Sequence, residues 1–79
     1  MVKLENISRK GNTITCDVFV EDCKEAVSLV FHTTNGVIEA GTLPEGYEWC
    51  GTHLWKAKNA LKEIAETNLD EKRRTIMWY

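Results

Sequence analysis

Cys50 and His53 are the residues of this sequence whose types and spacing most directly suggest catalysis. They lie three positions apart at the expected start of a helix, where backbone dipoles favour a thiolate. A histidine beside such a thiolate is the core of a nucleophilic cysteine site. The sequence shows no obvious residue to orient His53 and no recognisable oxyanion loop, and 79 residues leave little room for a substrate cleft. We therefore expect no enzyme, and an enzyme built on Cys50 and His53 is kept as an alternative.

Zinc binding is the second chemistry that these residues could support. A structural zinc site needs four ligands, usually as two close pairs. Cys50 and His53 would supply one pair, but six residues separate Cys16 from Cys23, and Cys16 falls on the apolar side of its strand. We expect no metal and no cofactor, and a zinc site stays a second alternative beside the Cys50–His53 enzyme. In the simpler interpretation Cys50 is buried at the helix entrance, and His53 borders the apolar stripe and hydrogen-bonds the preceding loop.

The tryptophans suggest binding rather than catalysis. A regular helix would expose Trp55, with Lys58 and Lys62 on the same flank. An exposed tryptophan beside lysines can anchor a protein partner, stack on a base or form a cation–π pair. The alternative is that Trp55 packs under the loop of Tyr47 and Trp49 or against the C-terminal strand.

The end of the chain is too apolar to remain in water. Ile-Met-Trp-Tyr (76–79) must dock in the sheet or bind another chain, and its alternation favours docking in the sheet. Lys72, Arg73 and Arg74 form a basic cluster that could meet a phosphate or simply be a solvated strand start. The acidic residues of an earlier connection are expected to be solvated: Glu21, Asp22 and Glu25.

The elements that position these residues follow from hydrophobic periodicity. Alternation of apolar and polar residues predicts strands, which are expected at Val2–Ser8, Thr13–Val20, Ala26–His32 and Val37–Leu43. A change of phase between Leu4 and Ile7 suggests a bulge or an early end of the first strand, and Asn35-Gly36 is a hairpin signal. Thr52 is the expected N-cap of a helix, which ends in Asn68–Glu71, before a last strand at Arg73–Tyr79. The apolar stripe of that helix comprises Leu54, Ala57, Leu61, Ile64 and Ala65.

The order β-β-β-β-α-β predicts an α+β fold, with a mostly antiparallel sheet of four to five strands and one helix on one face. The last strand could pair antiparallel with the first or lie parallel beside the fourth. The other sheet face stays uncovered and is a natural place for self-association or a partner. It would carry Thr13, Thr15, Phe19, Ala26, Val30 and His32.

Composition narrows the class of protein. The length predicts one domain over residues 1–79. A net charge of −2 argues against a general nucleic-acid binder, since such proteins carry a basic face. We expect no membrane span, because no apolar run is long enough. Three cysteines without a secretory signal suggest reduced thiols in the cytoplasm.

The C-terminal half resembles a family of short uncharacterised proteins from Clostridia-like Firmicutes and their phages or mobile elements. The residues that carry the resemblance are Tyr47, Cys50, His53, Ala57, Leu61, Ile76, Met77, Trp78 and Tyr79. The resemblance implies a genetic context and no particular activity. Because small proteins of mobile elements often act by binding, as inhibitors or decoys, it favours a binding role.

The sequence therefore predicts a small, non-enzymatic protein-binding module, as a homo-oligomer or with another protein. The alternative is a protein that sequesters a small nucleotide-like anion, stacked on Trp55 or Trp78 with a basic side chain on its phosphate. The predicted binding surface joins the helix entrance to the C-terminus. It consists of Tyr47, Trp49, His53, Trp55, Lys58, Arg74, Trp78 and Tyr79.

Overall fold

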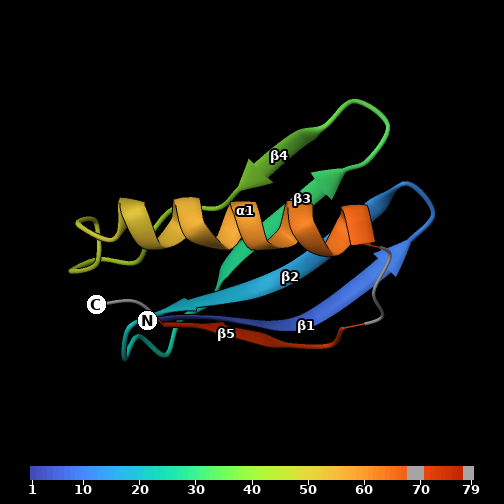
Figure 1. Cartoon of the computed structure of the whole chain (residues 1–79). Helices are drawn as coiled ribbons and strands as arrows, with labels where there is room; N and C mark the ends of the chain where they lie inside the picture. The colour runs from blue at the N-terminus through green and yellow to red at the C-terminus, as the bar shows by residue number, and fades with distance from the viewer. Residues whose placement is uncertain (68–70, 78–79) are drawn as a thin grey trace.

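A computed structural model of the chain describes residues 1–67 and 71–77. In this described part, five strands form one antiparallel sheet and one helix packs on it, which confirms the predicted α+β class. The elements are β1 (Val2–Lys10), β2 (Thr13–Val20), β3 (Val27–His32), β4 (Val37–Ala40), α1 (Gly51–Thr67) and β5 (Arg74–Ile76). The spatial order of the strands is β4-β3-β2-β1-β5, and Figure 1 shows α1 crossing one face of the sheet.

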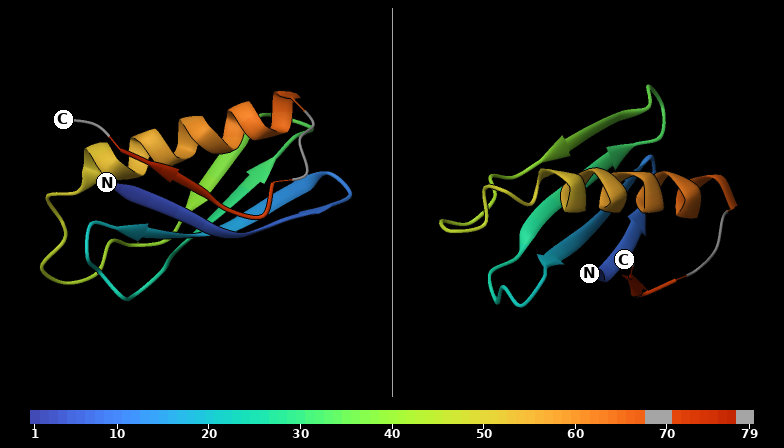
Figure 2. Two further views of the ribbon diagram at one scale, coloured as in Figure 1. Left: turned by 60° about the horizontal axis from the view of Figure 1, so that its bottom comes forward. Right: turned by 60° about the vertical axis from the view of Figure 1, so that its left-hand side comes forward.

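Strand β5 forms the edge of the sheet next to β1. The two strands pair antiparallel, with Val2 opposite Ile76 and Leu4 opposite Arg74, as Figures 1 and 2 show from three directions. Of the two predicted placements, the structure therefore has the one beside the first strand. Strand β5 is shorter than the predicted 73–79, and the last two residues of that prediction, 78–79, lie outside the described residues.

A bulge in β1 returns its apolar residues to the buried face. The register with β2 shifts between Glu5 and Ser8, and Asn6 adopts a left-handed φ of 54°, which asparagine tolerates better than most residues. The Asn6 amide donates to Asp17 Oδ2 at 2.9 Å. Ile7 is buried as a result, and β1 resumes pairing beyond the predicted end at Ser8, as far as Lys10.

The core lies between α1 and strands β1, β2 and β3. Each apolar residue of the alternating run in β2 is buried, as predicted: Ile14, Cys16, Val18 and Val20. From the predicted stripe of α1, Ala57, Leu61 and Ile64 are buried, while Leu54 and Ala65 are partly buried against the core. The residues predicted on the opposite, uncovered sheet face are exposed or only partly buried: Thr13, Thr15, Phe19, Ala26, Val30 and His32.

Three further predicted boundaries, besides those of β1 and β5, were wrong by one to three residues. The N–H of Leu54 donates to the Cys50 carbonyl at 3.1 Å, so Cys50 takes the cap position predicted for Thr52, because a turn at 47–50 leads directly into α1. Strand β3 begins at Val27 and not one residue earlier. Strand β4 ends at Ala40 and not at Leu43. The last backbone hydrogen bond to β3 runs from the Gly41 N–H to the Ser28 carbonyl, and the described residues that follow do not pair with β3.

The described part of the chain holds no helix with the length and apolarity that crossing a bilayer requires. Helix α1 has 17 residues, and charged and polar residues are interspersed among its buried ones.

The Leu61→Ala substitution tests the helix–sheet core. Leu61 is fully buried, and removing a buried leucine side chain costs about 2–5 kcal/mol of unfolding free energy. We expect urea denaturation to show a loss in that range, while Lys62→Ala, at an exposed neighbouring position, stays within about 0.5 kcal/mol of the wild type. Equal midpoints for the two variants would contradict this packing.

Candidate functional site

Glu21 connects three segments at the N-terminal end of α1. Its Oε1 accepts a hydrogen bond from the amino group of Met1 at 2.8 Å and one from His53 Nε2 at 2.5 Å. Its backbone N–H donates to the Met1 carbonyl at 2.9 Å, and its φ of 50° is left-handed. His53 is only 8% exposed, so Glu21 supplies an acceptor for a side chain that the helix turns inward.

Tyr47 and Trp49 hold the segment before α1 in place. The Tyr47 hydroxyl donates to Asp22 Oδ1 at 2.8 Å, and this hydrogen bond is the main cause of a raised pKa of Tyr47. Trp49 Nε1 donates to the Gly46 carbonyl at 3.0 Å. Its ring meets the ring of His53 edge to face, with centroids 5.4 Å apart. The indole of Trp49 is nevertheless 65% exposed.

The acidic residues of the β2–β3 connection were expected to be solvated, and Asp22 and Glu25 are exposed while Glu21 is partly buried. Glu21 and Asp22 each accept hydrogen bonds from the helix entrance. Their partners, His53 and Tyr47, are distant in the sequence, so local pattern gave no signal. A buried histidine that requires a carboxylate partner is the one clue that sequence reasoning could have used.

The thiol of Cys50 is not set up as a nucleophile. Cys50 is fully buried, and its pKa is raised, first by burial and then by the negative charge of Glu21. His53 Nε2 is bonded to Glu21, so that ring nitrogen is not directed at the sulfur. Among the residues that the structure describes, no cluster of three or more histidine, cysteine or acidic side chains is placed to hold a metal ion.

A groove between α1 and β5 brings predicted binding residues together. We call it the Trp55 groove. It has a volume of about 280 Å³ and is lined by Trp55, Lys56, Asn59, Ala60, Glu63, Arg74 and Ile76. Trp55 is 60% exposed, as the helical pattern predicted, and Met77, which follows β5, is 59% exposed.

Arg74 is fully engaged inside this groove. Its guanidinium donates two hydrogen bonds to the carboxylate of Glu71, one of them from Nε at 2.9 Å. Its Nη1 lies 3.5 Å from Glu63 Oε1. The hydrogen bond from Arg74 also lowers the pKa of Glu71. Arg74 therefore fixes the wall of the groove and is already neutralised by two carboxylates.

The structure divides the predicted binding surface into separate parts. Tyr47, Trp49 and His53 belong to the helix entrance, while Trp55 and Arg74 belong to the Trp55 groove. Lys58 is half-buried and, at about 100° per residue, lies on the flank of α1 opposite Lys56 and Glu63. The remaining two predicted residues, Trp78 and Tyr79, lie outside the described residues.

Comparisons of the chain with protein-family models, curated proteins and solved structures find no match. The fold and the two clusters of residues define a small α+β protein with an aromatic surface groove. Its function is inferred from the residues and their geometry, and the resemblance to short Firmicutes proteins stays a prediction.

Ionisation of Glu21 makes the unfolding free energy of the protein depend on pH. Hydrogen bonds from the Met1 amino group and His53 lower the pKa of Glu21 in the folded state below the ordinary value of 4.5. A carboxylate whose pKa is lower in the folded state than in the unfolded state stabilises the protein fully above pH 4.5. This stabilisation is lost as the pH falls through the pKa of the folded state. We expect Glu21→Gln to reduce the urea midpoint at about pH 7, and the difference from the wild type to shrink as acid protonates Glu21.

The matched control for this measurement is Glu25→Gln, at an exposed position of the same connection. It should leave the midpoint nearly unchanged at both pH values. If the difference in urea midpoint between the wild type and Glu21→Gln were the same at every pH, the negative charge of Glu21 would contribute nothing to stability.

Two of the three buried cysteines, Cys16 and Cys50, should resist alkylation in the native protein. Burial is the main cause that raises the pKa of Cys16 to about 12 and that raises the pKa of Cys50, so both thiols are protonated near neutral pH. We expect iodoacetamide to label them far more slowly in buffer than in about 6 M urea, as followed by intact mass. Rapid native labelling of Cys50 would instead support the Cys50–His53 enzyme alternative.

Proposed function

We propose that this protein is a small, non-enzymatic binding protein that contacts a protein partner through the Trp55 groove. The observation that carries the proposal is the 60% exposed indole of Trp55 on the wall of that groove. A large aromatic side chain left in water costs free energy. Tryptophan is also among the residues most enriched where binding energy concentrates at interfaces.

The surroundings of Trp55 have the composition of an interface centre. Ala60 and Ile76 supply apolar surface within the groove. Lys56 and Asn59 provide polar groups around this apolar surface. An apolar centre with a polar rim is the usual anatomy of a protein–protein contact.

The engagement of Arg74 favours a protein partner over a nucleotide at this groove. A phosphate would have to compete with the carboxylates of Glu71 and Glu63 for the same guanidinium. A neutral apolar or aromatic side chain can instead pack on Trp55 without disturbing that pairing. The nucleotide alternative therefore has little support from Trp55 and Arg74.

The burial of Cys50 supports a role without catalysis, because its protonated thiol lacks the activation that a nucleophile needs. The partner in this proposal is another protein or a second copy of the chain. The resemblance to short Firmicutes proteins suggests a cytoplasmic accessory protein of a phage or mobile element, which would act as an inhibitor or decoy.

Trp55→Ala tests the proposal, because the exposed side chain can be removed without opening the core. Tagged wild-type and variant proteins are used to capture partners from a lysate of the source cells, and each captured protein is then purified and titrated directly. Loss of an interface tryptophan typically costs at least about 2 kcal/mol, which is roughly a thirtyfold loss of affinity.

The control is Lys62→Ala, at an exposed position outside the groove lining, which should bind like the wild type. Sedimentation equilibrium of the same three proteins tests self-association. Equal affinity of Trp55→Ala and wild type for every partner, including a second copy, would refute the role of the groove.

A further inference from the structure

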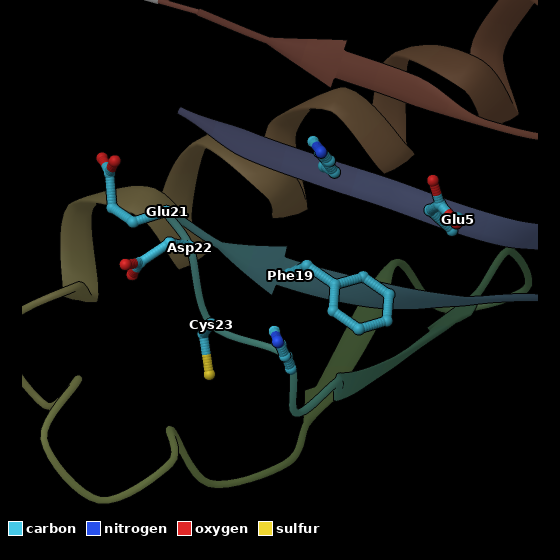
Figure 3. Close-up of a pocket in the computed structure, with 7 residues that line it drawn as sticks. Glu5, Phe19, Glu21, Asp22 and Cys23 are labelled. Carbon is cyan, nitrogen blue, oxygen red and sulfur yellow. The ribbon is translucent and has the colours of Figure 1, made fainter.

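A second cleft lies on the uncovered side of the sheet, away from the Trp55 groove. We call it the Phe19 cleft. It has a volume of about 380 Å³ and is lined by Lys3, Glu5, Phe19, Glu21, Asp22, Cys23 and Lys24. This volume falls within the range of about 300–1,000 Å³ that is typical of small-molecule sites. Figure 3 shows Phe19 on β2 with the β2–β3 connection to one side of it and Glu5 on the other.

The cleft exists because the chain turns sharply after β2. Glu21 has a left-handed φ of 50°, and the Cys23 N–H donates back to the Val20 carbonyl at 3.0 Å. This turn makes the connection one wall of the cleft. Lys3 lies directly opposite Phe19 in the β1–β2 register, so the two side chains emerge side by side on the uncovered face.

The charged groups of the cleft divide into engaged and available ones. Glu21 is held by the Met1 amino group and His53, and Asp22 accepts from Tyr47. In Figure 3 their carboxylates point away from the Phe19 ring. By contrast, Lys3 and Lys24 form no hydrogen bond or ion pair with any residue that the structure describes. Two available ammonium groups and the carboxylate of Glu5, which is also unpaired among the described residues, therefore line the cleft around one partly buried aromatic ring.

We propose that the Phe19 cleft binds a planar aromatic anion of the size and chemistry of a nucleoside monophosphate. The ring of the ligand stacks on Phe19, since base–aromatic stacking contributes to binding whatever the base. Its phosphate lies between Lys3 and Lys24, which act as point-charge phosphate ligands. Glu5 is available to accept an N–H from the edge of the base.

This site differs from the Trp55 groove in the state of its basic groups. At the groove the arginine is neutralised by two carboxylates, whereas at the cleft both lysines are available. The inference does not depend on the proposed function, because the lining residues of the two sites do not overlap. Either site can fail its test while the other passes.

The test is an NMR titration of the ¹⁵N-labelled protein with AMP, to about 5 mM, with adenosine and inorganic phosphate titrated separately. We expect the amide shifts to gather at Lys3, Phe19 and Lys24, with AMP binding more tightly than adenosine or phosphate. Added NaCl should weaken AMP binding, because the lysine–phosphate attraction is screened.

Lys3→Gln and Lys24→Gln should each weaken AMP binding by about tenfold, because each removes a charge-assisted hydrogen bond. Both positions are exposed, so the variants should fold. Phe19→Leu should weaken AMP binding but not phosphate binding. Lys62→Gln, at an exposed position outside the cleft lining, is the control and should bind AMP like the wild type.

Four results would overturn the proposal: no shifts at the highest AMP concentration, shifts centred on Trp55 and Arg74, phosphate binding as tight as AMP binding, or unchanged affinity in both lysine variants. In the third case the aromatic part of the proposal is refuted, since phosphate alone would account for the binding. Unchanged affinity in the lysine variants would refute the placement of the phosphate.

Discussion

One helix has to cover the apolar face of a sheet that is wider than the helix itself, and the rest of the structure follows from this constraint. An α-helix with its side chains is about 10 Å across, whereas neighbouring strands are about 4.8 Å apart. Helix α1 accordingly packs on β1, β2 and β3, while β4 and β5 flank the covered region. The Trp55 groove lies where α1 and β5 approach without closing over each other. The opposite face of the sheet has no covering helix in the described part of the chain.

The N-terminal end of α1 adds a second requirement, because the buried side of the helix begins with a polar residue. His53 is turned inward with Ala57 and Leu61, and a buried imidazole needs a hydrogen-bond partner. Glu21 supplies it across the interface. The β2–β3 connection has to fold back to bring Glu21 there, and the same turn forms one wall of the Phe19 cleft. The hydrogen-bond partner that buried His53 requires therefore also determines the shape of the Phe19 cleft on the uncovered face of the sheet.

The two surface hollows differ in their electrostatics more than in their size. In the Trp55 groove the guanidinium of Arg74 is paired with Glu71 and Glu63, which leaves an apolar and aromatic surface as the binding feature. In the Phe19 cleft the ammonium groups of Lys3 and Lys24 have no partner among the described residues. A basic side chain that is already paired with carboxylates is less able to bind an anion than one without such a partner. The pairing of the basic groups therefore distinguishes the surface that suits a protein side chain from the surface that suits an anion.

Local periodicity in the sequence determined the elements and the buried face of each, whereas the exposure of Trp55 was left open between a surface position and packing under the loop of Tyr47 and Trp49. Alternation over Thr13–Val20, the change of phase before Ile7 and the spacing of Ala57, Leu61 and Ile64 all describe side chains within one element, where backbone geometry fixes direction. These features were predicted because each depends on neighbours a few residues apart.

The tertiary structure alone decided which distant groups meet. The placement of β5 beside β1, the hydrogen bond between Glu21 and His53 and the pairing of Arg74 inside the groove each join segments brought together by packing. The sequence pattern was compatible with β5 beside either the first or the fourth strand, and with Glu21 in water. Contacts of this kind depend on the burial of the whole core, which no local pattern encodes.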